Sequence, residues 1–290
     1  MEGRLTKPIA IVAILVALVL GVVEGVTEFL PVSSTGHLIL SAWLMGLASD
    51  PARWDAAFTF EIVIQAGAIL AVLGLYRARV ARMLRGLVGR DPAGARLLVR
   101  LVVAFLPAAV LGLALSGEIA KRLNGPWPVA AALFAGGVLL LALGRFLPLR
   151  HDGKTLEDLS LRDALVIGLL QCLALWPGTS RSMATIAGGL LLGYRPVAAA
   201  EFSFLLALPT LGAATAYKAA KDGGTMLERL GPLPIAVGFA AATVSAALAV
   251  RWLVGFLDRR GVAPFGWYRI AVATVVAALL LSGAMDVPSR

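Results

Sequence analysis

The stretch EGVTEFLPVSSTGHL, from Glu24 to Leu38, decides the fold because it interrupts a long apolar segment that begins at Pro8. It places two carboxylates, a run of hydroxyls and a histidine where the flanking sequence suits a membrane helix. Pro31 lacks a backbone donor and ends a helix. A helix broken at bilayer depth survives only where protein or a water-filled cavity satisfies the freed backbone groups. We therefore expect residues 8–47 to form a helical hairpin that enters the membrane and returns, with its break buried.

A second apolar segment, residues 163–194, is broken in the same way by Pro-Gly followed by Thr-Ser-Arg-Ser. Gly21–His37 aligns with Gly168–Met183 when one gap is allowed, and this alignment places Ser34 opposite Ser180. The pattern indicates two copies of one unit, and a chance similarity between two apolar segments is the alternative. We expect the second segment to form another returning hairpin.

The composition indicates a membrane protein. Hydrophobic residues make up 59% of the 290 residues, and the mean hydropathy is +0.88. Charged residues make up 15%, against about 25% in an ordinary soluble domain. The net charge of +9 comes mostly from arginines between apolar runs, which suits loops facing anionic head groups and gives no sign of nucleic-acid binding. We predict an all-α, polytopic membrane protein with about six spanning helices, near residues 58–76, 101–117, 123–144, 202–217, 230–250 and 270–285.

The whole chain, residues 1–290, is predicted to be one integral membrane domain, with repeat 1 over about 8–147 and repeat 2 over about 160–285. The arginine-rich loop 77–100 should face the cytoplasm, because cytoplasmic loops carry an excess of Arg and Lys. Alternating outward from that loop makes the first hairpin enter from outside and the second from the cytoplasm. Such inverted-topology repeats bring their broken helices together near the bilayer midplane.

Glu24 and Glu28 are spaced one helical turn apart and therefore share a helix face. Two carboxylates repel each other in an apolar environment, and a cation between them removes that cost. Oxygen ligands without cysteine favour a hard ion, so we expect Glu24 and Glu28 to bind a divalent cation, Mg²⁺ or Ca²⁺. The simpler alternative is a pair of partly hydrated carboxylates near the membrane surface.

Ser33, Ser34 and Thr35 precede a new apolar run, and hydroxyls in such a position cap the free amides of a helix. The same amides and the helix dipole bind anions such as phosphate. Capping alone would explain these residues, but His37 follows them, and histidine transfers protons near neutral pH. A histidine that only forms hydrogen bonds is the alternative to a catalytic one.

Arg181 lies between two uncharged segments, where an arginine is costly unless it meets an anion. Its planar fork suits phosphate oxygens, and an ion pair with Glu28 is the alternative. Together these groups supply the parts for phosphoryl transfer, in which Ser34 or a water attacks phosphorus and His37 or Glu28 handles the proton. The predicted catalytic residues are Glu28, Ser34, His37 and Arg181, and the predicted phosphate-binding residues are Ser33, Thr35, Gly178, Thr179, Ser180 and Arg181.

At this point the two broken segments can be compared with a known family. EGVTEFLPVSSTGHL together with ALWPGTSRS, from Ala174 to Ser182, resembles the two signature regions of bacterial undecaprenyl-diphosphate phosphatases of the bacitracin-resistance type. FEIVIQAGAILAVL, EFSFLLALPT and PFGWYRIAVA extend the resemblance over most of the chain. One departure is visible, because Met183 stands where similar sequences usually have Gly.

The resemblance implies a multi-pass hydrolase of the bacterial inner membrane, acting on a polyprenyl diphosphate lipid. It would release the terminal phosphate of undecaprenyl diphosphate, recycle the lipid carrier for peptidoglycan and confer bacitracin resistance when overproduced. It also implies a divalent-cation requirement, a homodimer and an active site that opens to the periplasmic face. The important family positions fall on Glu24, Glu28, Ser34, His37 and Arg181. A polyprenyl-phosphate flippase or transporter with the same inverted repeat is the alternative function.

Overall fold

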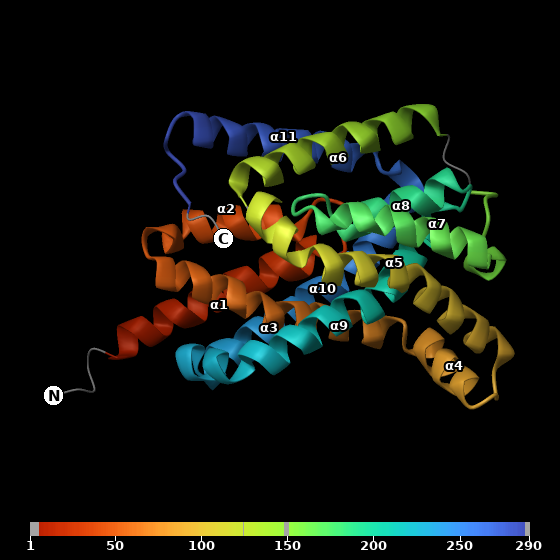
Figure 1. Cartoon of the computed structure of the whole chain (residues 1–290), viewed down its shortest axis with the longest axis horizontal. Helices are drawn as coiled ribbons and strands as arrows, with labels where there is room; N and C mark the ends of the chain where they lie inside the picture. Colours follow the sequence, from red (N-terminus) through yellow and green to blue (C-terminus); the bar gives the residue numbers. More distant parts are fainter. Residues whose placement is uncertain (1–5, 124, 148–150, 288–290) are drawn as a thin grey trace.

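This computed structural model describes residues 6–123, 125–147 and 151–287, and the two ends of the predicted domain, residues 1–5 and 288–290, lie outside the described residues. The described part is helical and contains no strand (Figure 1). Its α-helices are α1 Thr6–Thr27, α2 Ser34–Leu44, α3 Pro51–Leu75, α4 Arg77–Leu87, α5 Pro92–Leu123, α6 Pro126–Phe146, α7 Leu161–Gln171, α8 Arg181–Leu191, α9 Pro196–Leu230, α10 Pro232–Arg260 and α11 Ala263–Leu281. Short 3₁₀ helices are η1 Leu47–Ser49, η2 Leu156–Asp158 and η3 Cys172–Leu175.

The six expected spans are confirmed within the described residues. Helices α3, α5, α6, α9, α10 and α11 are long and apolar enough to cross a bilayer. Most extend beyond the uncharged stretches read from the sequence, because a helix continues through charged residues that can reach the interface. Proline opens many of these helices, since its missing N–H costs nothing in a first turn.

The sequence pattern suggested that the segment 77–100 is a loop, but the structure shows that most of it is helical. It contains all of α4 and the start of α5, joined by a short turn. Helix α4 combines buried Met83 and Gly86 with exposed arginines, so its two faces differ in polarity. It projects at one end of the bundle (Figure 1).

Two hairpins, α1–α2 and α7–α8, turn back inside the bundle, as expected from the two proline breaks. The second hairpin opens at the same end as α4, because Arg79 binds Glu157 just before α7. Tyr194, which follows α8, donates to Asp163 on α7 and so closes the base of that hairpin. The first hairpin opens at the opposite end (Figure 1). The predicted opposite entrances are therefore confirmed, and the assignment of the α4 end to the cytoplasm stays a prediction.

Small residues bring the helices into close contact. A Cβ added at Gly21 would lie 2.5 Å from the carbonyl oxygen of Gly238, so α1 lies directly on the backbone of α10. A Cβ at Gly137 would lie 2.9 Å from the carbonyl oxygen of Gly266, so α6 and α11 are equally close. The Gly- and Ala-rich segment 130–143, which could have lined a groove for a prenyl tail, is used for helix packing.

We predict that Gly25→Ala lowers the thermal unfolding midpoint of the protein in detergent. Its Cβ would lie 2.1 Å from Ser245 Oγ and 2.4 Å from the carbonyl oxygen of Ala242, so α1 and α10 must separate. Such overpacking costs about 1–3 kcal/mol. Gly74→Ala is the matched control, because nothing lies within 4 Å of the added Cβ. Equal midpoints for the two variants would contradict this packing.

Candidate active site

Glu24 and Glu28 lie at the end of α1, where the first hairpin breaks. Glu24 is fully buried and Glu28 is 7% exposed, so both carboxylates are removed from bulk water. Neither carboxylate oxygen of Glu24 has a hydrogen-bond partner within the described residues. The alternative of hydrated surface carboxylates therefore does not describe Glu24, which needs an electrostatic partner.

The two breaks share an unusual backbone conformation. Ser33, just before α2, and Ser180, just before α8, both have φ 74°, and among the described non-glycine residues only these two have a positive φ. Such conformations cost about 1–3 kcal/mol each and gather at functional sites. The backbone pairs Ser33, and not Ser34, with Ser180. Ser34 and Arg181 consequently occupy the same place, as the first residue of α2 and of α8.

The prediction that the two breaks meet is confirmed by contacts between them. Ser182 Oγ donates to the carbonyl oxygen of Leu30 at 2.8 Å, which joins the start of α8 to the first break. Glu28 accepts a hydrogen bond from Ser34 Oγ on Oε2, at 2.7 Å. Its other oxygen, Oε1, lies 3.5 Å from Arg181 Nη2. Glu28 therefore sits between the first residues of α2 and α8.

Within the described residues, only one of the three guanidinium nitrogens of Arg181 forms a hydrogen bond. Its Nη1 donates to the carbonyl oxygen of Ser203 at 2.8 Å, and Ser203 Oγ accepts from Thr185 at 2.7 Å. Nε and Nη2 are buried without a hydrogen-bond partner within the described residues. A buried guanidinium with two unused donors beside Glu28 suits an incoming anion. Ser203 and Thr185 were missed from the sequence, where they look like ordinary polar residues of apolar helices.

His37 does not contact Ser34 or Glu28 through any hydrogen bond in the described structure. Its Nδ1 lies 2.7 Å from the carbonyl oxygen of Ser33, and its Nε2 lies 2.7 Å from Tyr268 Oη. The two rings are stacked, with centroids 5.5 Å apart. The structure therefore places His37 at the edge of the site, where it supports the strained Ser33 backbone.

Of the remaining predicted phosphate-binding residues, Thr179 and Ser180 lie at the second break and Thr35 lies at the first. Ser180 Oγ accepts from the amide of Met183 at 3.2 Å and lies 3.0 Å from Ser182 Oγ, so Ser180 is an N-cap of α8. The amide of Thr179 donates to the carbonyl oxygen of Trp176 at 3.1 Å. Thr35 lies in the first turn of α2 and is half-buried. Met183 is buried, and its side chain is accommodated without loss of the cap.

Arg269 on α11 is a site residue that the sequence interpretation missed. It is fully buried, and its guanidinium donates to four carbonyl oxygens. Two of these belong to the breaks, Pro31 at 3.3 Å and Gly178 at 3.0 Å, and the others to Ala132 and Leu133. Arg269 therefore fastens both breaks to α6. Arg181 was predicted as a site residue because it lies between apolar segments, and Arg269 also lies beside apolar segments.

A divalent cation fits the carboxylates at the end of α1. The buried, unpartnered oxygens of Glu24 are hard ligands next to Glu28. No cluster of three or more His, Cys, Asp or Glu side chains that could hold a metal occurs among the described residues. An ion here would take its remaining ligands from water and from a bound phosphate, which is how Mg²⁺ is usually held.

We predict that Arg269→Met strongly lowers both the thermal unfolding midpoint and any activity of the site. Removal of the guanidinium leaves four buried carbonyl oxygens without donors, at about 1–3 kcal/mol for each unsatisfied group. Arg251→Met, at an exposed position on α10, is the matched control and should leave the midpoint unchanged. Equal unfolding midpoints for Arg269→Met and the control would show that the two breaks keep their structure without the Arg269 guanidinium.

Comparison with known proteins shows which family this chain belongs to. A family described as bacitracin resistance protein BacA matches residues 17–275. A protein named undecaprenyl-diphosphatase from Sorangium cellulosum (strain So ce56) is 50% identical over 264 residues, which cover 90% of this chain and 84% of the relative. Another of that name, from Cereibacter sphaeroides (strain ATCC 17029 / ATH 2.4.9), is 49% identical over 272 residues, which cover 93% of this chain and 97% of the relative. The chain belongs to the BacA family of bacitracin resistance proteins.

Proposed function

We propose that this chain is an undecaprenyl-diphosphate phosphatase of the bacterial inner membrane. It hydrolyses the terminal phosphate of undecaprenyl diphosphate and returns undecaprenyl phosphate to peptidoglycan synthesis. The observation that carries the proposal is the contact of Glu28 with both Ser34 and Arg181, which joins the two breaks into one buried polar site. The named relatives are diphosphatases, and nothing in the comparisons favours the alternative of a lipid flippase.

Arg181 is proposed to bind the terminal phosphoryl group. Its Nε and Nη2 are buried and form no hydrogen bond within the described residues, and charge-assisted hydrogen bonds are strongest in such a water-excluding site. As the phosphate binds, the contact of 3.5 Å between Arg181 and Glu28 gives way to contacts with phosphate oxygens. The first amides of α2 and α8 add donors from two helix N-termini.

Glu28 is proposed to be the general base. Ser34 Oγ already donates to Glu28 Oε2 at 2.7 Å, whereas both ring nitrogens of His37 are engaged elsewhere. Glu28 accepts the proton from the attacking hydroxyl of Ser34, or from a water in its place, as the new O–P bond forms and the bridging P–O bond breaks. A divalent cation held by Glu24 and Glu28 would neutralise diphosphate charge.

The prenyl chain is proposed to lie in an apolar groove between α1 and α10. This groove has a volume of about 750 Å³ and is lined by Leu18, Val22, Val26 and Leu30 on α1 and the following turn, with Trp252 on the opposite side. Leu30 is also the residue whose carbonyl oxygen binds Ser182, so the groove ends at the first break. An opening toward the periplasmic face fits the release of spent diphosphate there. The homodimer implied by the resemblance stays a prediction.

We predict that Glu28→Gln lowers phosphate release from undecaprenyl diphosphate by about 10²–10⁴-fold, the range for a lost general base. Purified protein in detergent and a phosphate-release assay measure this directly. Glu118→Gln, at an exposed carboxylate on α5, is the matched control and should keep full activity. Full activity in Glu28→Gln would remove Glu28 from the chemistry.

The attacking group can be identified at Ser34. We expect Ser34→Ala to lower phosphate release, because Ser34 Oγ orients Glu28. Acid quenching of the wild-type protein with terminally labelled substrate traps label on Ser34 if serine attacks, and leaves the protein unlabelled if water attacks. Complete retention of activity in Ser34→Ala would exclude the serine nucleophile.

Removal of divalent cations should abolish phosphate release, and added Mg²⁺ should restore it. Glu24→Gln should raise the Mg²⁺ concentration needed for half-maximal activity, because it neutralises the unpartnered buried carboxylate. Glu118→Gln serves again as the control and should leave that concentration unchanged. Undiminished activity in a chelator would contradict the metal proposal.

A further inference from the structure

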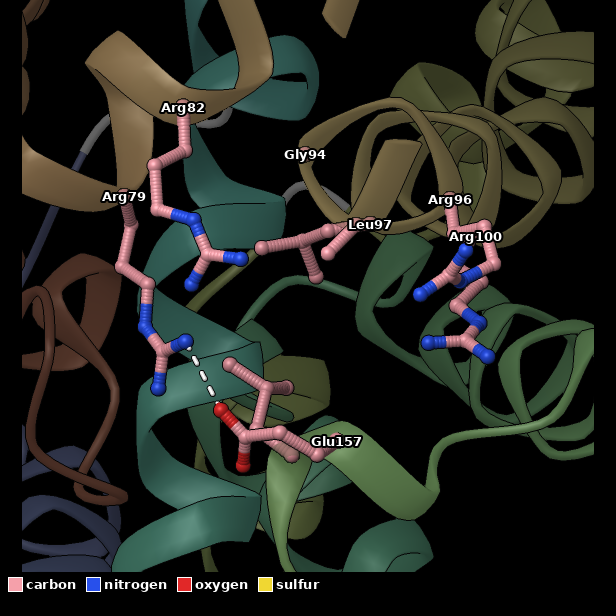
Figure 2. A pocket seen from close by; sticks show the side chains of 9 residues that line it. Arg79, Arg82, Gly94, Arg96, Leu97, Arg100 and Glu157 are labelled. Carbon is pink, nitrogen blue, oxygen red and sulfur yellow. Dashed lines mark hydrogen bonds and ion pairs between the residues drawn. The ribbon is translucent and has the colours of Figure 1, made fainter. Parts of the chain in front are cut away.

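A small cavity lies between α4, the start of α5 and η2, and none of its lining residues belongs to either break. It has a volume of about 80 Å³, and four arginines line it: Arg79 and Arg82 from α4, and Arg96 and Arg100 from α5. Figure 2 shows the side chains of the two pairs reaching from opposite sides of Leu97 toward the same space. Four guanidinium groups around so small a volume repel one another unless negative charge is present.

Acidic side chains neutralise the first pair only. Arg79 donates to Glu157 at 2.8 Å and to Glu201 at 2.9 Å, and Arg82 donates to Asp91 at 3.0 Å. These hydrogen bonds hold the pKa of Glu157 and of Asp91 below the usual value, so both carboxylates are charged at neutral pH.

Within the described residues, Arg96 and Arg100 form no ion pair and no side-chain hydrogen bond. All three carboxylates, Glu157, Glu201 and Asp91, pair with the arginines of α4, so the two charges without an ion-pair partner are on the α5 side of the cavity. The unpartnered guanidinium groups can therefore bind an anion there.

A close crossing of α4 and α5 builds this cavity. A Cβ added at Gly94 would lie 2.0 Å from the carbonyl oxygen of Arg82, and one at Gly86 would lie 2.3 Å from the amide of Ala95. The first turn of α5 therefore rests on α4, its Gly94 amide is capped by Asp91, and Ala93 and Gly94 form part of the cavity wall. The arrangement is fixed by backbone contacts, which limits the entropy lost when an anion binds.

The position of α4 at the ends of two spanning helices is the reason we infer that the cavity lies at the level of lipid head groups. Helix α4 joins the ends of the spanning helices α3 and α5. Leu84 and Leu87 at the end of α4 and the following Val88 are 59%, 67% and 66% exposed, beside exposed Arg85. An amphipathic helix with this distribution lies in the membrane interface, with apolar residues toward acyl chains and basic residues at head-group level.

We propose that this cavity binds a phosphate group supplied by an anionic lipid head group. Arg96 and Arg100 provide charge-assisted donors, and the exposed apolar side chains at the end of α4 contact the acyl chains. Leu156 and Glu157 of η2 also line the cavity, so the bound head group joins α4 and α5 to the segment that leads into the second hairpin. Binding to the folded state alone raises its stability.

The test measures the thermal unfolding midpoint of the full chain in nanodiscs of phosphatidylcholine, with and without phosphatidylglycerol. Phosphatidylglycerol should raise the midpoint of the wild type. The shift should be lost in Arg96→Gln/Arg100→Gln, whose affinity for a titrated short-chain phosphatidylglycerol should fall about tenfold or more. Arg96→Gln alone, at an exposed position, should show a smaller loss and serves if the double variant folds poorly.

Arg77→Gln/Arg90→Gln is the matched control. It removes the same charge from exposed positions near the same end of the bundle, outside the cavity, and should keep the wild-type shift. Equal loss in the control and cavity variants would show that general surface charge attracts the lipid and would overturn the proposal. Inorganic phosphate is added separately to the wild type in phosphatidylcholine. A shift as large as that from phosphatidylglycerol would contradict the lipid as the source of the phosphate group.

Discussion

The buried contact of Glu28 with Ser34 and Arg181 is the constraint on which the rest of the structure depends. Neither charge is stable alone at bilayer depth, so each hairpin supplies what the other lacks. The contact is loose, at 3.5 Å between Arg181 Nη2 and Glu28 Oε1, and two guanidinium donors remain unused. The proposed binding of a phosphate to Arg181 rests on these two donors.

Arg269 stabilises the backbone of the two breaks, whereas Glu28 and Arg181 join them through their side chains. A helix broken inside a membrane exposes carbonyl oxygens that no water can satisfy. Arg269 donates to carbonyls of both breaks and of α6, which lets two non-helical turns persist beside each other. The strained backbone at Ser33 and Ser180 is retained because these contacts, the His37 contact with the Ser33 carbonyl oxygen and the Ser180 cap of α8 determine the conformation.

Much of this architecture could be predicted from the sequence, because apolar run length, proline and the cost of buried charge are local signals. These signals identified the six spans and both breaks, and they predicted that Glu28 and Arg181 would meet, as they do. Arg269 escaped notice because it directly precedes an uncharged run and looks like a residue that marks the end of a span. Other features depend on backbone angles that residue identities do not display. They are the hydrogen bond from Ser34 to Glu28, the orientation of His37 toward Ser33, and the equivalence of Ser33 with Ser180.

A double-mutant cycle between Glu28→Gln and Arg181→Gln, followed by thermal unfolding in detergent, tests the joining of the two hairpins most directly. Each single variant strands one buried charge, which is strongly destabilising, whereas the double variant strands neither. The account predicts that the double variant is more stable than the sum of the single effects allows, by about 1 kcal/mol or more. Losses that simply add would contradict the claim that these two residues share one buried site.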